Sequence, residues 1–392
     1  MKEFIFKIFK MKEKYLYLSI ILLFFLISFH HLNSGFYMSS DSYKFSSLAD
    51  NLIELNFNLY HFYFSDSVDF QKVTPFFFTI PAFLIALCKI IFLDKWQHAF
   101  LILNLIFVFF SIIIFTKILL NIGVRSFLIF LNLPLILMSV DVLTWPRYIL
   151  ADMNYAFLVI LITYFITKGF VENKFNYLVI FLILFLILLT RPTSISIIFA
   201  VIFFFTIMKY QIFLKHKAIL FFILTLFITV PLVFGILYYC IKFQFTEITQ
   251  LEWLPDSLYP ISMVKSGMII HERPETWVDV PSNFKDIAFV YFLRLVYFFN
   301  PYAATFSINH NILNIIQTFF IFLSIFIWSF FGGVSKIKDK TFFLIIILSI
   351  SVAAFHSFTL IDYDWRYRFP IILPLLMLFP ISLEIILRKY KL

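Results

Sequence analysis

The chain has 392 residues, of which 62% are apolar and 14% are charged, and its mean hydropathy is +0.97. This composition excludes a soluble domain, which needs a polar surface around its core. The formal net charge of +9 comes from lysines and arginines that lie between apolar runs. That placement is typical of the cytoplasmic loops of a membrane protein rather than of a surface that binds nucleic acid.

Long apolar runs recur along the whole chain, and each is about long enough to cross a hydrocarbon core roughly 30 Å thick. Because lipid offers no hydrogen-bond partners, the backbone of each run must satisfy its own polar groups, as an α-helix does. We therefore predict an all-α polytopic membrane protein with about ten transmembrane helices, or up to twelve. The predicted spans are 15–32, 97–117, 126–140, 153–168, 176–190, 193–208, 218–241, 309–331, 341–360 and 367–387.

The N-terminal segment sets the orientation. "MKEFIFKIFKMKEK" carries five lysines and two glutamates directly before the apolar run Tyr15–Phe29. No small-residue cleavage pattern follows this run, so we expect an uncleaved first span with the N-terminus in the cytoplasm. Residues 33–74 then lie outside, and their five acidic residues against two lysines agree with that side.

The apolar run Pro75–Phe92 decides the topology, because a span there would reverse the side of every later loop. If the run lies in the outer interface instead, the basic loops all fall inside, and loop 243–286, with seven acidic and three basic residues, falls outside. The same reasoning makes 286–300 interfacial, since Asp286 and Arg294 would be costly within a span. The basic loops are Lys117–Arg125, Lys168–Lys174, Lys209–Lys217, Lys336–Lys340 and Arg388–Lys391.

The domain organisation is simple. We expect one membrane domain, 1–392, with two outer elaborations at 33–95 and 243–308 and both termini in the cytoplasm. No internal repeat and no linker rich in Pro, Gly or Ser divides it. The two cysteines, Cys88 and Cys240, are far apart and have neither a disulfide pattern nor a metal-ligand spacing.

With this topology, the unusual polar residues gather at the outer ends of the spans. Carboxylates and guanidiniums are costly near hydrocarbon, so a convergent set indicates a functional site. For any single residue the alternative is an interfacial anchor or a snorkelling side chain, which we favour for Glu54, Asp66 and Asp69. The candidates are Asp41, Tyr43, Asp141, Arg147, Asp152, Arg191, His310, Asp362, Asp364, Arg366 and Arg368.

Four segments carry a recognisable pattern. They are "DSYKFSSLADNL" (41–52), "QKVTPFFFTIPAF" (71–83), "LLTRPTS" (188–194) and "WRYRFPIILP" (365–374). Taken in this order they resemble the GT-C membrane glycosyltransferases, among them the protein O-mannosyltransferases and the lipid A aminoarabinose transferases. The second segment keeps Lys72 and Pro75 of the Lys–Pro–Pro–Leu segment of these enzymes, with a looser spacing. The first keeps a single acidic residue, Asp41, where the O-mannosyltransferases have a pair.

The resemblance implies a GT-C-like fold, with interfacial helices in the first outer loop, in the cytoplasmic membrane. It also implies an enzyme that moves a sugar from a polyprenyl-phosphate donor to an acceptor on the extracytoplasmic side. The implied partners are this donor, membrane lipid and an unidentified lipid, glycan or protein acceptor, and no nucleic acid. No nucleotide-binding motif is present. A divalent metal stays open, because metal dependence varies among GT-C enzymes.

Transfer with inversion needs a base that takes the proton of the acceptor hydroxyl. Asp41, the first carboxylate after the first span, is expected to be this base. The structural alternative is that Asp41 N-caps a helix beginning near Tyr43. Asp152, suited to orienting the acceptor or holding a metal, and Asp141 are the other catalytic candidates, and the sequence does not choose between them.

The reaction also needs cations that hold the phosphate leaving group, and guanidinium offers two parallel donors for it. The expected phosphate ligands are Arg191, Arg366, Lys72 and Arg368. Tyr43, Tyr367 and His310 are expected to contact substrate. For Tyr367 the alternative is an interfacial aromatic belt, and for His310 a helix cap or anchor.

Two other functions fit a chain of this kind. A polysaccharide polymerase of the O-antigen type has a similar number of spans, but its site typically uses arginines of the outer loops, and loop 243–286 has only Arg273. A transporter of lipid-linked glycans would place charges midway through its spans, or breaks at matching positions of two repeats. Convergence of Asp41 and Arg191 at one outer cavity favours the transferase, whereas a continuous polar path through the bilayer favours transport.

Overall fold

The computed structural model describes residues 13–63, 75–209, 269, 274–280, 284–333, 335–359 and 365–390. These residues are all-α, apart from one isolated backbone bridge between Tyr37 and Tyr148. The helices are α2 (Glu13–Ser34), α3 (Ser40–Glu54), α4 (Leu59–Tyr63), α5 (Thr79–Phe92), α6 (Trp96–Asn121), α7 (Ser126–Leu137), α8 (Val140–Thr144), α9 (Asp152–Glu172), α10 (Tyr177–Leu188), α11 (Ser194–Lys209), α15 (Phe284–Phe298), α16 (Ile308–Phe331), α17 (Lys336–Thr359), α18 (Phe369–Leu376) and α19 (Leu378–Lys389). Short 3-10 turns η1 (Pro75–Phe78), η2 (Leu93–Lys95), η3 (Trp145–Arg147), η4 (Pro274–Thr276) and η5 (Trp365–Arg368) join some of them.

Several helices have the length and composition of membrane spans. The described residues hold six of them, or seven if the pair Ser126–Leu137 and Val140–Arg147, bent by 57°, counts as one span. The chain is thus a multi-pass membrane protein, as its composition predicts. The six are Glu13–Ser34, Pro75–Asn121, Asp152–Glu172, Ile308–Phe331, Lys336–Ser357 and Arg366–Lys389.

This number is smaller than the ten spans expected from the sequence. The runs expected at 176–190 and 193–208 form α10 and α11, with 12 and 16 residues. At a rise of about 1.5 Å per residue they are about 18 and 24 Å long, shorter than a hydrocarbon core of roughly 30 Å. The run expected at 218–241 lies outside the described residues.

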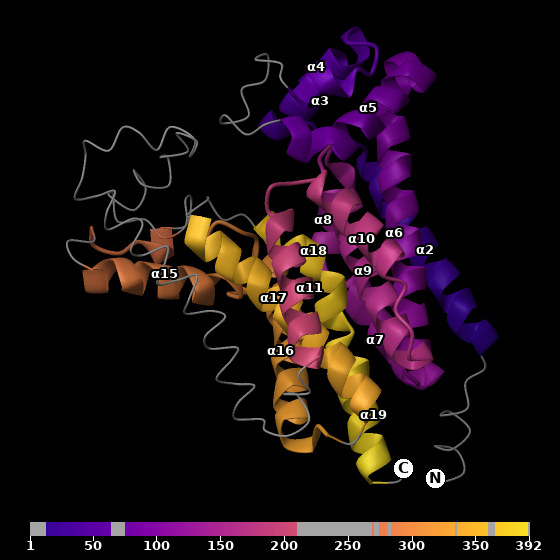
Figure 1. Cartoon of the computed structure of the whole chain (residues 1–392), viewed down its shortest axis with the longest axis vertical. Helices are drawn as coiled ribbons and strands as arrows, with labels where there is room; N and C mark the ends of the chain where they lie inside the picture. Colours follow the sequence, from indigo (N-terminus) through magenta and orange to yellow (C-terminus); the bar gives the residue numbers. More distant parts are fainter. Residues whose placement is uncertain are drawn as a thin grey trace.

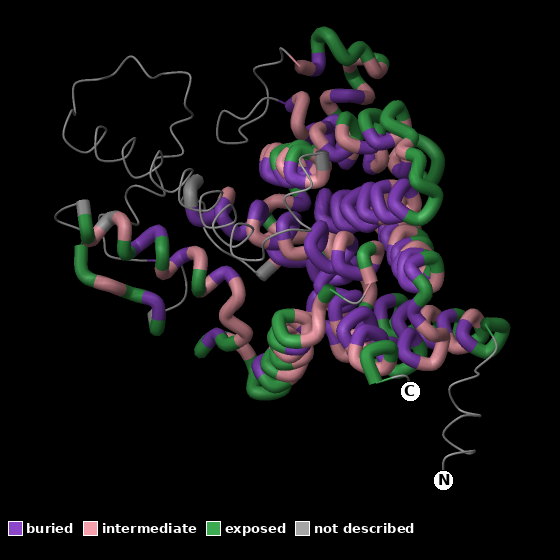
Figure 2. Tube along the Cα trace, turned by 60° about the horizontal axis from the view of Figure 1, so that its bottom comes forward, coloured by how far each residue is buried: buried purple, intermediate pink, exposed green. Residues whose placement is uncertain are grey.

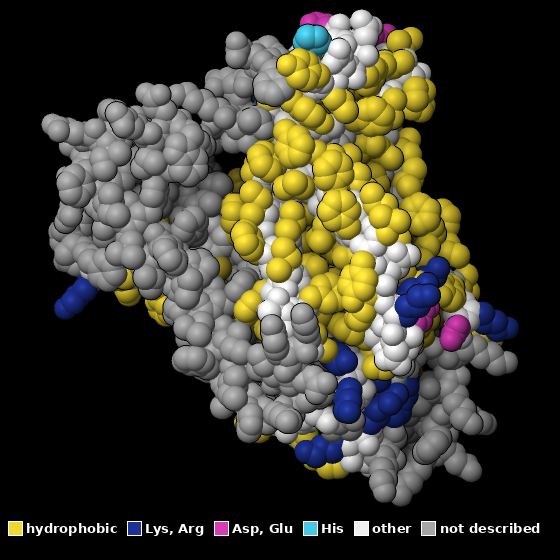
Figure 3. Space-filling view, viewed as in Figure 1, with side chains coloured by type: hydrophobic (Ala, Val, Ile, Leu, Met, Phe, Trp, Pro, Cys, Tyr) yellow, Lys and Arg dark blue, Asp and Glu magenta, His cyan; other side chains and the backbone are white. Residues whose placement is uncertain are grey.

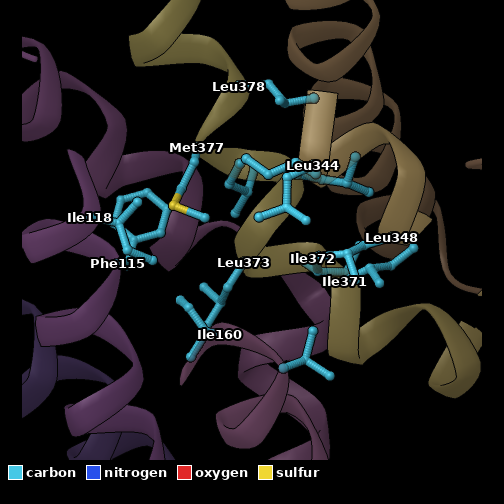
Figure 4. Close-up of a cluster of buried hydrophobic side chains, with 14 of the residues drawn as sticks. Phe115, Ile118, Ile160, Leu344, Leu348, Ile371, Ile372, Leu373, Met377 and Leu378 are labelled. Carbon is cyan, nitrogen blue, oxygen red and sulfur yellow. The ribbon is translucent and has the colours of Figure 1, made fainter. Parts of the chain in front are cut away.

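A large apolar core lies at the centre of the bundle. α9 packs against α6, α10 and α18, and α17 packs against α11 and α18. Figure 4 shows where these helices meet, with Phe115 of α6, Ile160 of α9, Leu344 of α17 and Leu373 of α18 among the buried side chains. Figure 2 shows the central helices buried, while exposed residues lie at the edges. Outward apolar side chains there, such as Phe181, form the surface expected to face lipid.

A second, smaller core lies at one end of the bundle. Figure 1 shows α3, α4 and α5 gathered at this end. Phe45, Leu48, Phe62 and Ala82 pack here together with Phe100 from the first turns of α6. α5 therefore forms a cap with α3 and α4, and it does not count as a crossing helix separate from α6. We call this end the cap end.

The opposite end of the bundle is basic, as Figure 3 shows for one face. The α6–α7 turn and the starts or ends of α17 and α19 meet there through paired charges. Glu384 accepts from Arg388 (2.9 Å) and lies 3.5 Å from Arg125, and Lys338 donates to the carbonyl of Ile122 (2.8 Å).

α15 differs from the rest in direction. Figure 1 shows it extending to the side of the bundle, roughly crosswise to the long helices, and it packs against α17. Its Arg294 is buried and donates to the backbone carbonyl of Ile269. The sequence predicts an interfacial segment at 286–300, and this orientation is compatible with that prediction.

The two ends of the bundle predict a labelling result. In a protein whose Cys88 and Cys240 are replaced by alanine, Asn58→Cys lies exposed at the cap end and Lys174→Cys lies exposed between α9 and α10. In sealed right-side-out vesicles, an impermeant maleimide should modify residue 58 at once and residue 174 only after permeabilisation. Modification of both in sealed vesicles would place the two ends on one side of the membrane.

Candidate functional site

Four charged side chains from distant parts of the chain meet in one network. Arg366 of η5 donates from Nη1 to Oδ2 of Asp41 (2.8 Å), and its Nε lies 3.3 Å from Oδ2 of Asp152. Asp152 in turn accepts from Nη1 of Arg191. Asp41, Arg366, Asp152 and Arg191 thus form a continuous alternation of negative and positive charge, which we call the charged cluster.

The start of α3 places Asp41. Ser39 is the N-cap: its hydroxyl accepts from the backbone N–H of Ser42 (3.2 Å), and the hydroxyl of Ser42 accepts from the backbone N–H of Ser39 (3.0 Å). The helix therefore begins at Ser40, and the expected alternative that Asp41 caps a helix near Tyr43 is wrong. Asp41 instead lies in the first turn, where the helix dipole favours a carboxylate, and its side chain reaches Arg366.

Asp152 is the most deeply buried member. It is the first residue of α9, its side chain is 1% exposed, and each of its oxygens faces a different guanidinium. A buried carboxylate is tolerated only when it is paired. One of its partners, Arg191, comes from the α10–α11 turn and the other, Arg366, from η5. Asp152 therefore joins three segments of the bundle.

Tyr367 supports both arginines. Its ring centroid lies 5.1 Å from the guanidinium carbon of Arg191 and 5.6 Å from that of Arg366. The buried ring of His356 lies 4.5 Å from the same ring and stacks on Phe298 at 5.8 Å. Cation–π contacts of this kind fix the direction of a guanidinium. Tyr367 thus belongs to the site, although a contact with substrate is not needed to explain its position.

The electrostatics of Asp41 follow from these contacts. Burial alone would raise the pKa of the carboxyl, but the Arg366 guanidinium, helped by Lys44 at 3.7 Å and by Arg191, holds this pKa below its ordinary value. Asp41 is therefore ionised at neutral pH. Its folded pKa lies below the unfolded value of about 4, so its contribution to stability is present above that pH and is lost as the pH falls through the folded pKa.

One backbone bond and the side-chain contacts of the charged cluster bring the four sequence segments together. The backbone N–H of Ile80, from the second segment, donates to the carbonyl of Leu189 in the third (3.0 Å). Asp41, Arg191 and Arg366 come from the first, third and fourth. Lys72, the expected phosphate ligand of the second segment, lies outside the described residues.

Other expected site residues have different surroundings. Asp141 is buried and accepts from the indole N–H of Trp145 (3.1 Å), so between the two carboxylates it is Asp152 that joins the charged cluster. Arg147 donates to the carbonyls of Ser34 and Gly35, which fixes the end of α2. Tyr43 is 64% exposed, and no contact between it and the cluster is present in the described chain.

Two further candidates lie on another side of η5. Arg368 donates from Nη1 to the carbonyl of Asn300 (3.1 Å), and His310 stacks on Phe306 with 4.4 Å between ring centroids. Arg366 and Arg368 are two residues apart on a 3-10 turn, and their side chains bond to different partners. Arg366 therefore belongs to the charged cluster, whereas Arg368 lies outside it, near α16.

Sequence reasoning missed two residues of the site. His356 lies in the expected span 341–360. An ionisable residue within a span is by default a functional candidate, so His356 could have been identified from its position in the sequence. Tyr155 is buried one turn after Asp152, with its hydroxyl near Thr193 of the turn that carries Arg191. Nothing in the pattern of an apolar helix distinguishes such a tyrosine from an ordinary core residue.

The comparisons with known proteins add no relative. No protein-family model matches this sequence, and no curated protein or solved structure is significantly similar to it. Within the described ranges, no group of three or more His, Cys, Asp and Glu side chains is arranged to hold a metal ion.

The burial of Asp152 predicts a large effect on stability. Asp152→Ala leaves two buried guanidiniums without their shared partner, so the free energy of unfolding should fall by about 3–5 kcal/mol. Asp50→Ala is the matched control, since Asp50 is 55% exposed and pairs with Lys89, and it should cost about 0–1 kcal/mol. Unfolding in mixed micelles measures both. Equal effects of the two substitutions would show that Asp152 does not hold the cluster together.

Proposed function

We propose that this protein is a membrane glycosyltransferase that moves a sugar from a polyprenyl-phosphate donor to a hydroxyl acceptor outside the cytoplasmic membrane. The observation that carries this proposal is the charged cluster, in which Asp41 lies beside Arg366 at one end of a membrane bundle. Three of its four members come from segments that resemble GT-C enzymes. The basic residues at the opposite end support an extracytoplasmic position for the cluster.

The two carboxylates of the cluster suit different tasks. The Asp41 side chain is 31% exposed, so an acceptor hydroxyl can reach it, whereas Asp152 is 1% exposed and already faces two guanidiniums. Asp41 is accordingly the base, and Asp152 holds Arg191 and Arg366 in place. A carboxylate that is ionised at neutral pH can accept the hydroxyl proton directly.

The contact between Asp41 and Arg366 links the two halves of the reaction. As the acceptor oxygen attacks the anomeric carbon, its proton passes to Asp41, and the bond from that carbon to the phosphate oxygen breaks with its electron pair on the phosphate. Protonation neutralises Asp41, so the charge of Arg366 becomes available to the leaving phosphate as negative charge develops there. Attack opposite to the leaving group inverts the anomeric centre.

The alternatives are less well supported. A transporter needs polar groups along a path through the bilayer, whereas the charged cluster is confined to the starts of α3 and α9, the α10–α11 turn and η5. A polymerase of the O-antigen type would place its working arginines in an outer loop. Here Arg191 and Arg366 lie at helix ends, in contact with the only two carboxylates that the cluster contains among the described residues.

The proposal predicts a large loss of transfer for Asp41→Asn. Asparagine retains an oxygen for Arg366 but cannot take a proton, so sugar transfer should fall by about a hundredfold or more. The melting temperature should change little, because Asp41 is partly exposed. The measurement is release of polyprenyl phosphate from a panel of polyprenyl-phosphate sugars, by protein in vesicles that contain native lipid extract.

Asp50→Asn, on the same helix and also ion-paired, is the control and should transfer at the parent rate. A parent rate for Asp41→Asn would move the base to Asp152 or Asp141. If the parent protein turns over no donor of the panel, the proposal itself is contradicted.

A further inference from the structure

An apolar groove runs along the bundle beside α16, α17 and α18, which lie together in Figure 1. Its volume is about 500 Å³. The walls are almost entirely hydrocarbon, and typical wall residues are Ile321, Phe322, Ile325, Phe343, Ile346 and Ile372. Along α16 the lining runs from Gln317 to Ser329, a distance of about 18 Å at 1.5 Å per residue. That is more than half of a hydrocarbon core roughly 30 Å thick.

The two ends of the groove differ. Trp328 and Phe342 line the end near the basic side of the bundle, whereas Arg368 and Gln317 line the end nearer to η5. A groove that is apolar along its length and cationic at one end matches an amphiphile with one long chain and an anionic head group. Arg368 supplies a guanidinium, which suits phosphate in particular.

A second, independent observation points to a ligand at the same end. Gln317 is 4% exposed and Asn314, one turn earlier on α16, is 1% exposed. Both polar atoms of the Asn314 side chain and Oε1 of Gln317 have no hydrogen-bond partner in the described chain. Buried amides are almost always bonded, and leaving them unpaired is costly, so each such group needs an explanation.

The next amide on this helix face shows the ordinary arrangement. Asn311 donates to the carbonyl of Ala303 (2.9 Å) and accepts from the backbone N–H of the same residue (3.0 Å). α16 therefore presents one satisfied amide and then two with polar atoms unpaired among the described residues, of which Gln317 lines the groove and Asn314 lies one turn before it on the helix. The unsatisfied pair is suited to the oxygens and hydroxyls of a polar head group.

We propose that this groove is a binding site for a single-chain lipid phosphate. The phosphate lies on Arg368, other oxygens of the head group bond to Gln317 and Asn314, and the chain fills the space between α16, α17 and α18. The site is separate from the charged cluster, since Arg368 bonds to Asn300 whereas Arg366 bonds to Asp41. It goes beyond the proposed function, because lipid binding here does not require that the protein transfer a sugar.

The single groove also decides against an ordinary phospholipid. A glycerophospholipid has two chains, and a groove of about 500 Å³ offers room for about one of them. The second chain would have to lie outside the groove. A single-chain lipid phosphate fits all three features: its chain fits the groove, its phosphate fits Arg368, and its other head-group oxygens fit the amides.

The test uses the full chain in phosphatidylcholine nanodiscs, with hexadecyl phosphate as the probe and the shift in melting temperature as the readout. The parent protein should be stabilised by the probe in a saturable way. Asn314→Leu and Gln317→Leu should melt higher than the parent without probe, because each removes an unsatisfied buried amide, and should bind the probe at least tenfold more weakly. A higher melting temperature together with weaker probe binding would not arise if the two amides had a purely structural role.

Asn311→Leu is the matched control. It breaks two bonds to Ala303, so it should melt lower than the parent and retain the affinity for the probe. The proposal is overturned if the Asn314 and Gln317 variants bind the probe like the parent, or if they melt lower, which would mean that their amides are already satisfied. It is also overturned if dioleoyl phosphatidylglycerol binds as tightly as hexadecyl phosphate.

Discussion

Arg366 lies between two carboxylates, and this contact joins the cap end to the core of the bundle. A guanidinium in a membrane protein must be paired, and here the partners are Asp41 of α3 and Asp152 of α9. Because Asp152 also pairs with Arg191, the network ties the cap helices, the bundle core and the turn between α10 and α11. Tyr367, packed below both arginines, restricts their directions further.

The convergence of the cluster was predictable from the sequence, because the constraint is a simple one. Charged residues at the ends of apolar runs must avoid hydrocarbon, and alternating spans bring every second end to the same side of the membrane. Asp41, Arg191 and Arg366 fall on one side by that reasoning. The helical class of the chain and its multi-pass character follow from composition alone, with α2 (Glu13–Ser34) as one example.

Finer features depend on contacts that no pattern reveals. The capping pair Ser39 and Ser42 sets the first turn of α3, and so turns Asp41 toward the cluster while Tyr43 stays exposed. Asp141 and Asp152 look equivalent in the sequence. They differ in the structure because Asp152 is the first residue of α9, where it meets the two arginines. The expected number of spans was too high for the described residues, because α10 and α11 keep an apolar composition at less than spanning length.

The most direct test of this account is a double-mutant cycle on the contact between Asp41 and Arg366. The free energy of unfolding would be measured for Asp41→Ala, which removes the side-chain oxygens altogether, for Arg366→Gln and for the double variant. If the two side chains form the pair described, the double variant should be less destabilised than the sum of the single variants, by about 1 kcal/mol or more. Effects that add to within about 0.3–0.5 kcal/mol would contradict the contact, and with it the assembly of the charged cluster.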